Sequence, residues 1–180
     1  MEARWTDRPD VTDFGTLVEA YQSSVFNLCY RMLGEARSAE DATQETFLRA
    51  FQHFGSYDPE RPFKTWLLSI ASHHCIDRLR RQHPQWSGVD VDLMLHHPAL
   101  REPAPGPEMM AIRREESALV QQLLEGLRPH DRCAIILRYW YDLSYLQIAD
   151  VLGATVAGVK SRLHRARLAL GGMLAPVAES

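Results

Sequence analysis

A proline-rich stretch without regular apolar spacing divides this chain of 180 residues into two parts. Residues 83–107 contain five of the ten prolines. Because proline lacks a backbone donor and fixes φ, neither a long helix nor a central strand can cross this stretch. On both sides of it, apolar residues recur every three or four positions, which is the period of an amphipathic helix, and no alternation typical of strands occurs. The sequence therefore predicts an all-α fold with two small helical domains joined by a flexible linker.

The apolar spacing and the turn residues predict where the helices begin and end. We expect domain boundaries at 1–82, 83–107 for the linker, and 108–180. Gly34 suits the end of the first helix, and Ser38 to Asp41 has the spacing of a capping box for the second. On that second helix Phe47, Leu48 and Phe51 are expected to point inward. The expected helices cover about 13–33, 38–54, 62–82, 108–127, 129–140, 145–152 and 156–170.

Composition excludes several classes of protein. The chain is 46% hydrophobic and 24% charged, which is typical of a folded soluble protein. No apolar run approaches the roughly 20 residues of a membrane span, and residues 1–13 lack the apolar segment of a secretion signal. We therefore expect a cytoplasmic protein with no membrane association. Cys29, Cys75 and Cys133 are far apart in sequence and odd in number, so buried free thiols are expected rather than disulfides.

The last two expected helices have the proportions of a helix-turn-helix. Ser144 to Gln147 has capping-box spacing, Gly153 suits the turn, and Thr155 can cap the last helix. The expected helix 156–170 has an apolar side formed by Val159, Leu163, Ala166 and Leu170. It carries four cations and no carboxylate: Lys160, Arg162, Arg165 and Arg167. Such a helix is either a solvated basic surface or a helix that reads the DNA major groove.

A metal site is the main alternative that the histidines suggest. His73, His74 and Cys75 are adjacent, as are His96 and His97. Neighbouring side chains on a helix diverge by about 100°, so the first three cannot easily bind one ion. There is no pair of cysteines with zinc spacing and no glycine-rich phosphate loop. We expect no metal, no cofactor and no enzymatic activity.

Two blocks of sequence resemble a known family. The segments 127–129, 143–149 and 159–167 are similar to region 4 of an extracytoplasmic-function sigma factor, which belongs to group 4 of the sigma-70 family. The segment 39–51 is similar to region 2.2 of that family, and 58–67 with 76–81 is similar to regions 2.3 and 2.4. The resemblance implies a dissociable subunit of bacterial RNA polymerase that directs the enzyme to promoters.

For the first domain, the resemblance implies polymerase docking and minus-ten DNA melting. Asp41, Gln44 and Glu45 match the positions that bind the clamp coiled coil of the β′ subunit, and their spacing places them on one helix face. Tyr57 lies where the family holds an unstacked base, and bases in this state are gripped by aromatic stacking. Trp66 fits the apolar period and is expected in the core. The other residues implied at the minus-ten element are His73, where relatives often have asparagine, and Arg78, Arg80 and Arg81.

For the second domain, the resemblance implies contact with the β flap and recognition of the minus-thirty-five element. Lys160, Ser161, His164 and Arg165 match positions that reach bases or nearby phosphates, while Arg162 and Arg167 are expected to meet phosphates. The linker of about 25 residues can span roughly 80 Å when extended. Members of the family commonly have an anti-sigma partner. The alternative, a free-standing helix-turn-helix repressor or activator, gives Asp41, Gln44 and Glu45 no role.

Overall fold

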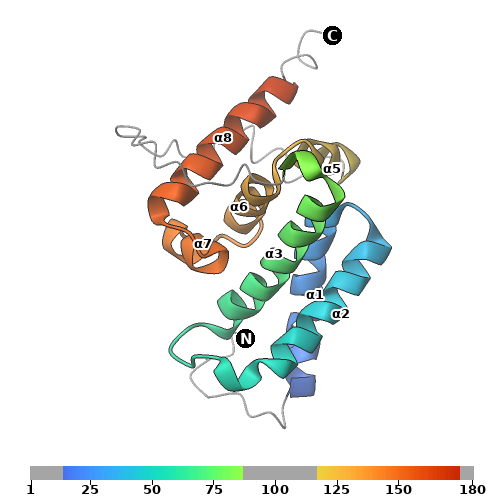
Figure 1. The fold of residues 1–180 in the computed structure, drawn as a ribbon, viewed down its shortest axis with the longest axis vertical. Coiled ribbons are helices and arrows are strands. Elements are labelled where there is room, and N and C mark those ends of the chain that lie inside the picture. Colours follow the sequence, from blue (N-terminus) through green and yellow to red (C-terminus); the bar gives the residue numbers. More distant parts are fainter. Residues whose placement is uncertain (1–13, 87–116, 175–180) are drawn as a thin grey trace.

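The computed structural model describes residues 14–86 and 117–174, and in these residues every regular element is a helix. The predicted all-α class is therefore confirmed, and the predicted linker lies outside the described residues beyond position 86. Residues 108–116, which were expected to be helical, also lie outside them. Figure 1 shows the order α1 (Phe14–Leu33), α2 (Ala36–Gln52), η2 (Phe54–Ser56), α3 (Phe63–Gln82), η3 (Pro84–Trp86), α5 (Ser117–Glu125), α6 (Pro129–Tyr139), α7 (Tyr145–Leu152) and α8 (Val156–Leu174).

The helix-turn-helix begins and ends with the predicted capping residues. The Ser144 hydroxyl accepts from the Gln147 N–H at 3.2 Å, and the Gln147 side chain accepts from the Ser144 N–H at 2.8 Å. Gly153 ends α7 with a φ of +61°, a conformation that glycine adopts without strain. Thr155 then accepts from the Gly158 N–H at 3.0 Å and starts α8. Local sequence signals therefore determine this motif.

The capping box predicted at Ser38 is wrong. Helix α2 begins at Ala36, with Glu35 as the capping residue, and the Ser38 hydroxyl donates to the Glu35 carboxylate at 2.6 Å. Gly34 explains the difference, because its φ of +79° reverses the chain directly after α1. The backbone is thereby free to re-enter a helix two residues later, before Ser38 is reached.

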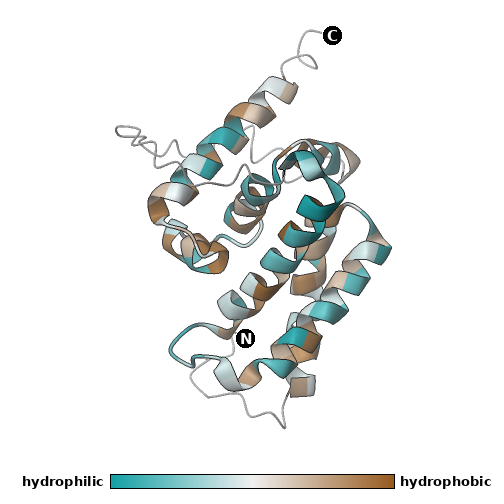
Figure 2. Ribbon diagram, viewed as in Figure 1, coloured by the Kyte–Doolittle hydropathy of each residue, from teal (hydrophilic) through white to brown (hydrophobic). Residues whose placement is uncertain are grey.

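The two expected domains pack against each other and share one continuous buried core. The bundle α1–α2–α3 forms the first module, and α5–α6–α7–α8 forms the second. Helix α3 packs on α1 and α2 and also on α6 and α7, and α1 contacts α5 and α6, so α3 lies between the modules (Figure 1). The long helices carry hydrophilic and hydrophobic residues (Figure 2), as expected of helices that bury one side.

Candidate functional site

Helix α2 presents a polar face with two large apolar side chains beside it. Asp41 and Gln44 are exposed, and Glu45 accepts from the Arg49 guanidinium at 2.6 Å. The hydrogen bond from Arg49 lowers the pKa of Glu45, so this carboxylate is charged at neutral pH. Leu48 is 51% exposed, seven positions after Asp41, and therefore continues the same face. This face is able to bind a partner that offers both cations and apolar surface.

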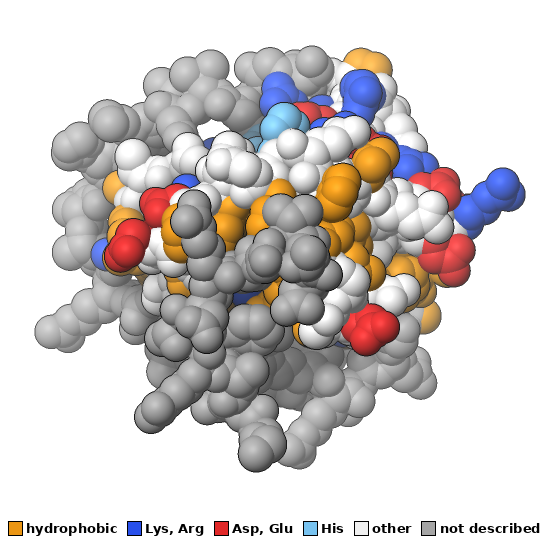
Figure 3. Space-filling model, turned by 90° about the horizontal axis from the view of Figure 1, so that it is seen from below, with side chains coloured by type: hydrophobic (Ala, Val, Ile, Leu, Met, Phe, Trp, Pro, Cys, Tyr) orange, Lys and Arg blue, Asp and Glu red, His pale blue; other side chains and the backbone are white. Residues whose placement is uncertain are grey.

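The expectation that Leu48 and Phe51 point inward is wrong. Phe51 is 52% exposed, although its ring contacts Phe14 edge-on with 5.2 Å between the centroids. Figure 3 views the end of the molecule at which α2 passes into α3, and hydrophobic side chains gather in the centre of this face. Phe47 on the same helix is buried. The presence of an aromatic residue therefore does not by itself predict which side of α2 faces the core.

Tyr57 lies in the loop before α3, within a cluster of aromatic rings. Its hydroxyl donates to the Arg61 carbonyl at 2.6 Å, which closes the loop, and burial raises the pKa of Tyr57. The ring lies 5.1 Å from Trp66 and 5.5 Å from Phe63 between centroids. Trp66 is half-buried at the edge of the core rather than inside it. Two half-exposed aromatic rings therefore lie next to each other where the sequence predicted one.

The other residues implied at the minus-ten element take different positions along α3. His73 is exposed, and its Nδ1 lies 2.8 Å from the Ser69 carbonyl oxygen. Arg78 is half-buried and donates to the Ser38 hydroxyl of α2 at 2.9 Å, so this arginine connects α3 to α2. The implied role of Arg78 at the minus-ten element stays a prediction.

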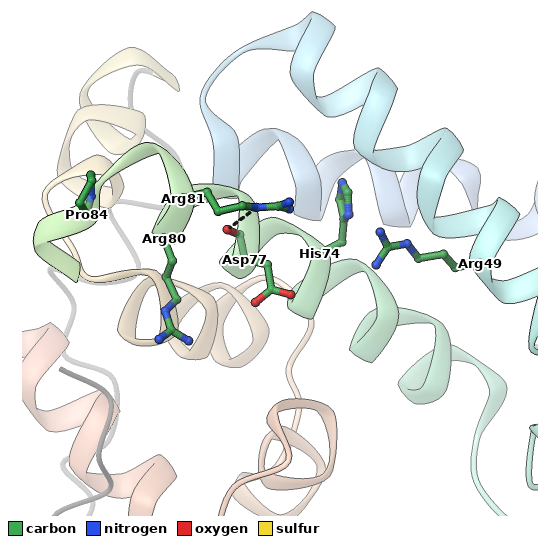
Figure 4. A pocket seen from close by; sticks show the side chains of 6 residues that line it. All are labelled: Arg49, His74, Asp77, Arg80, Arg81 and Pro84. Atoms are coloured by element: carbon green, nitrogen blue, oxygen red, sulfur yellow. Dashed lines mark hydrogen bonds between the residues drawn. The ribbon is translucent and has the colours of Figure 1, made fainter. Parts of the chain in front are cut away.

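A groove of about 650 Å³ lies between α2 and the C-terminal half of α3. Figure 4 shows that side chains from both helices line it. Four of the six lining residues are basic, namely Arg49, His74, Arg80 and Arg81, and the other two are Asp77 and Pro84. Burial, followed by the nearby Arg49 charge, lowers the pKa of His74, whose Nδ1 has no hydrogen-bond partner among the described residues. Arg81 donates to the Asp77 carbonyl at 3.2 Å. Such a groove attracts an anion.

Sequence reasoning identified only part of this groove. Arg80 and Arg81 were predicted, whereas Arg49 and His74 were missed. His74 and Arg81 are seven positions apart on α3, so their common face could have been found from the helical period. No sequence signal places Arg49 beside them, because it belongs to α2.

Helix α8 buries its predicted apolar side and leaves four predicted contact residues at least partly accessible, namely Lys160, Ser161, His164 and Arg165. Val159, Leu163 and Ala166 are 0% exposed. Lys160 is exposed, and Ser161 and His164 are half-buried. The predicted division of this helix into an apolar and a polar side is therefore confirmed for these positions.

Arg165 and Arg167 of α8 have partners within the protein, and Arg162 is buried, which the sequence did not suggest. Arg162 is only 5% exposed, so in this arrangement it is not accessible for the phosphate contact that the sequence predicted. Arg165 makes a two-point contact with the buried Asp131 of α6, at 2.8 and 3.2 Å. Arg167 donates to the hydroxyls of Tyr139 at 3.1 Å and Tyr145 at 3.4 Å. These partners come from α6 and α7, which the helical period of α8 cannot reveal.

The described residues offer neither a metal cluster nor a membrane-spanning helix. Within 14–86 and 117–174, no group of three His, Cys, Asp or Glu side chains is arranged to hold a metal ion. In the same residues no helix is both long and apolar enough to cross a membrane.

The fold and its surfaces define a DNA-binding protein, in which a helix-turn-helix module is joined to a second helical module with a basic groove. Residues 17–84 match the family model of sigma-70 region 2, and residues 117–170 match that of sigma-70 region 4. The chain is 35% identical over 166 residues to the ECF RNA polymerase sigma factor SigW of Bacillus subtilis, with 89% of this chain and 88% of that protein covered. It is 34% identical over 177 residues to the RNA polymerase sigma-H factor of Pseudomonas aeruginosa, with 94% and 90% covered. The chain therefore belongs to the extracytoplasmic-function group of sigma-70 factors, which are transcription initiation factors and not enzymes.

Solved structures of similar fold include two protein complexes. CnrH in complex with the cytosolic domain of CnrY is 25% identical, with a TM-score of 0.65 and with 93% of this chain and 90% of that chain covered. RpoE in complex with the anti-sigma factor NepR from Bartonella quintana is 23% identical, with a TM-score of 0.65 and with 91% of this chain and 97% of that chain covered. This second structure is similar to the chain in fold.

Proposed function

We propose that the first module binds core RNA polymerase and the minus-ten element, while the second module reads the minus-thirty-five element. The observation that best supports this proposal is the combination of surfaces in one chain. The second module contains a helix-turn-helix, and the first module has both an exposed acidic face and a basic groove. A free-standing repressor requires only the helix-turn-helix. Run-off transcription with core polymerase on fragmented genomic DNA tests this function, because a sigma factor gives discrete transcripts and a repressor gives none.

The α2 face is proposed to bind the clamp coiled coil of the β′ subunit. Asp41, Gln44 and Glu45 supply polar and acidic groups, and Leu48 supplies apolar surface that is otherwise unfavourably exposed to water. The second module is proposed to contact the β flap, an assignment that rests on the family alone. Both contacts place the protein in the cytoplasm, where polymerase acts.

Replacing Gln44 and Glu45 by alanine is expected to weaken binding to core polymerase by about 10-fold or more, since central interface residues often contribute above 1 kcal/mol each. Thermal unfolding should change little, because exposed substitutions usually cost within about 0.5 kcal/mol. Titration of labelled protein with core polymerase measures the affinity. The matched control is Glu19→Ala with Gln22→Ala, the same residue types exposed on α1. Equal affinity of both variants for polymerase would remove the docking assignment.

The groove between α2 and α3 is proposed to hold a backbone phosphate of minus-ten DNA. Arg80 and Arg81 supply charge there, His74 adds a ring nitrogen from the same helix, and Arg49 adds a guanidinium from α2. Phosphate contacts of this kind position the strand without specifying its sequence. We therefore assign the base contacts of this module to Tyr57 and His73, which lie outside the groove.

Arg80→Ala is expected to weaken holoenzyme binding to all promoters alike and to lower the slope of log affinity against log salt by roughly one. The measurement is holoenzyme binding to two unrelated promoters at several salt concentrations. Arg37→Ala, an exposed arginine of α2 outside the groove, is the control and should leave the slope unchanged. A loss confined to one promoter sequence would instead make Arg80 a base-reading residue.

The exposed side of α8 is proposed to enter the major groove at the minus-thirty-five element. Lys160, Ser161 and His164 lie on this side, and all three offer hydrogen-bonding groups to base edges or phosphates. Arg165 and Arg167 are proposed to position α8 through their contacts with Asp131, Tyr139 and Tyr145. In this proposal they contact DNA only at the edge of the interface.

A protein inhibitor is also proposed as a partner. CnrH, which matches this chain over most of its length, was solved in complex with the cytosolic domain of CnrY. Exposed Leu146 and Leu168 are 71% and 64% accessible and provide apolar surface for such a partner.

A further inference from the structure

The basic groove between α2 and α3 contains a histidine beside its arginines. Among the six described residues that line the groove, His74 is the one of a type that titrates between about pH 5 and pH 8. Arginine keeps its charge throughout this range. The charge that the groove offers to a ligand therefore depends on whether the His74 ring carries one proton or two.

The two ring nitrogens of His74 have different surroundings. Nδ1 is buried and has no hydrogen-bond partner among the described residues. Because His74 lines the groove, Nε2 is the ring nitrogen that can meet a ligand (Figure 4). An imidazolium carries a proton on both nitrogens, so protonation leaves one buried N–H without an acceptor. This cost favours the neutral ring in the absence of an anion.

Charged residues on both helices surround His74. Burial is the largest influence and lowers the pKa of His74, and the positive charge of Arg49 on α2 is the next. Glu45 opposes this effect and is itself paired with Arg49 at 2.6 Å. The charged groups around the ring are Arg49 and Glu45 of α2 and Asp77, Arg78, Arg80 and Arg81 of α3.

An anion in the groove changes the balance that keeps His74 neutral. Its negative charge attracts the imidazolium and offsets the arginines that oppose protonation. It also provides an acceptor for a proton on Nε2. Three lining arginines face the single lining carboxylate of Asp77, so the groove attracts an anion even before His74 gains its proton. Proton uptake then follows from anion binding.

We propose that the groove is a proton-coupled phosphate site, in which a bound phosphate group places a proton on His74 and is therefore held more tightly as the pH falls. A backbone phosphate of DNA and a free phosphorylated molecule both offer this chemistry. Assigning the phosphate to minus-ten DNA rests on the proposed function, whereas the coupling to a proton rests on the groove itself.

The direction of the pH dependence follows from the two states of the groove. A bound anion raises the pKa of His74 above its value in the anion-free groove. The affinity therefore rises as the pH falls through the pKa of the bound state, and it levels off below the pKa of the free state. Because solvent screens charges at the protein surface, we expect the total gain in affinity to be about 3–10-fold.

The first test uses the full chain with sulfate as the probe. Sulfate is a tetrahedral anion like phosphate, but its own charge does not change between about pH 5 and pH 8. Sulfate replaces chloride at constant ionic strength, and NMR of the histidine rings measures the titration of His74, whose signal is identified by its loss in His74→Gln. Sulfate should raise the pKa of His74. The proposal is wrong if sulfate does not bind, or if it binds and leaves this pKa unchanged.

The second test removes the titrating group. His74→Gln retains a neutral side-chain donor and cannot take up a proton. Its affinity for sulfate should match that of the original chain at about pH 8 and should not rise towards about pH 5. The control is His53→Gln, the same change at an exposed residue at the end of α2, which should retain the about 3–10-fold rise. A rise that persists in His74→Gln would place the proton on another group and overturn the proposal.

Holoenzyme binding to a promoter fragment at the same two pH values identifies the source of the phosphate. If the phosphate belongs to minus-ten DNA, the gain in affinity at low pH should be smaller with His74→Gln than with the original chain. If sulfate behaves as expected and both chains bind the promoter with the same pH dependence, the proton-coupled site stands. The phosphate then belongs to a free phosphorylated molecule, and the proposed assignment of the groove to promoter DNA fails.

Discussion

Replacing Arg165 by alanine is expected to lower the free energy of unfolding by about 2 kcal/mol, because it leaves the buried Asp131 carboxylate without its two-point partner. Arg165 is 47% exposed at its side chain, so solvent screening keeps the effect below that of a fully buried pair. For a chain of this size the loss corresponds to a decrease of about 4–8 °C in the midpoint of thermal unfolding. Circular dichroism during heating measures it.

Two further variants determine whether this loss arises from the Asp131 pair. Lys160→Ala on the exposed side of α8 should change the midpoint by less than the equivalent of about 0.5 kcal/mol and should instead alter promoter binding. The double variant Asp131→Ala with Arg165→Ala should recover part of the stability, since removing both partners leaves no buried charge. An unchanged midpoint in Arg165→Ala, together with altered base preference, would make Arg165 a reader of DNA.

Tyr57→Ala is expected to reduce open-complex formation on duplex promoters by about 10–100-fold. The aromatic ring lies in the loop before α3, and capturing an unstacked base by stacking contributes about 1–3 kcal/mol. A promoter that is already melted at the minus-ten element should rescue much of the loss. Unstacking a base costs a few kcal/mol, and in such a template the bases are unstacked before the protein binds. Permanganate footprinting of unpaired thymines measures the melted fraction.

The control for this prediction is Tyr57→Phe, which retains the ring and removes only the hydroxyl bond to the Arg61 carbonyl. If stacking is the function of the ring, Tyr57→Phe should melt promoters nearly as well as the original chain. Equal defects of Tyr57→Ala on melted and duplex templates would show that the ring instead stabilises the loop through Phe63 and Trp66.

Local signals allowed the helices and their ends to be predicted. Gly153 and Ser144 act within four residues of their own positions, so the sequence contains all the information that the turn of the helix-turn-helix needs. Ser38 shows the limit of this reasoning. Its capping box had the correct spacing, but the left-handed Gly34 upstream lets the helix begin earlier, at Ala36. Two local signals thus compete for the start of α2, and neither signal alone predicts which one determines it.

Contacts between distant segments were not predictable from spacing. Four cations on α8 look alike in sequence, yet Lys160 is exposed while Arg165 is paired with Asp131, 34 positions earlier in the chain. The groove likewise depends on Arg49 lying opposite Arg81 across two helices. In both places some of the residues were predicted, and the partner from another helix was not, because only tertiary packing brings it close.

The way in which Arg132 is bonded has a consequence for how such a chain can diverge over evolutionary time. All three of its acceptors are main-chain oxygens, those of Met32, Glu125 and Leu127. Every residue type provides such an oxygen, so inherited changes in the side chains of α1 or of the α5–α6 turn do not remove the acceptors. A lineage can therefore remodel these outer surfaces for new binding partners while one arginine preserves the joint between the modules.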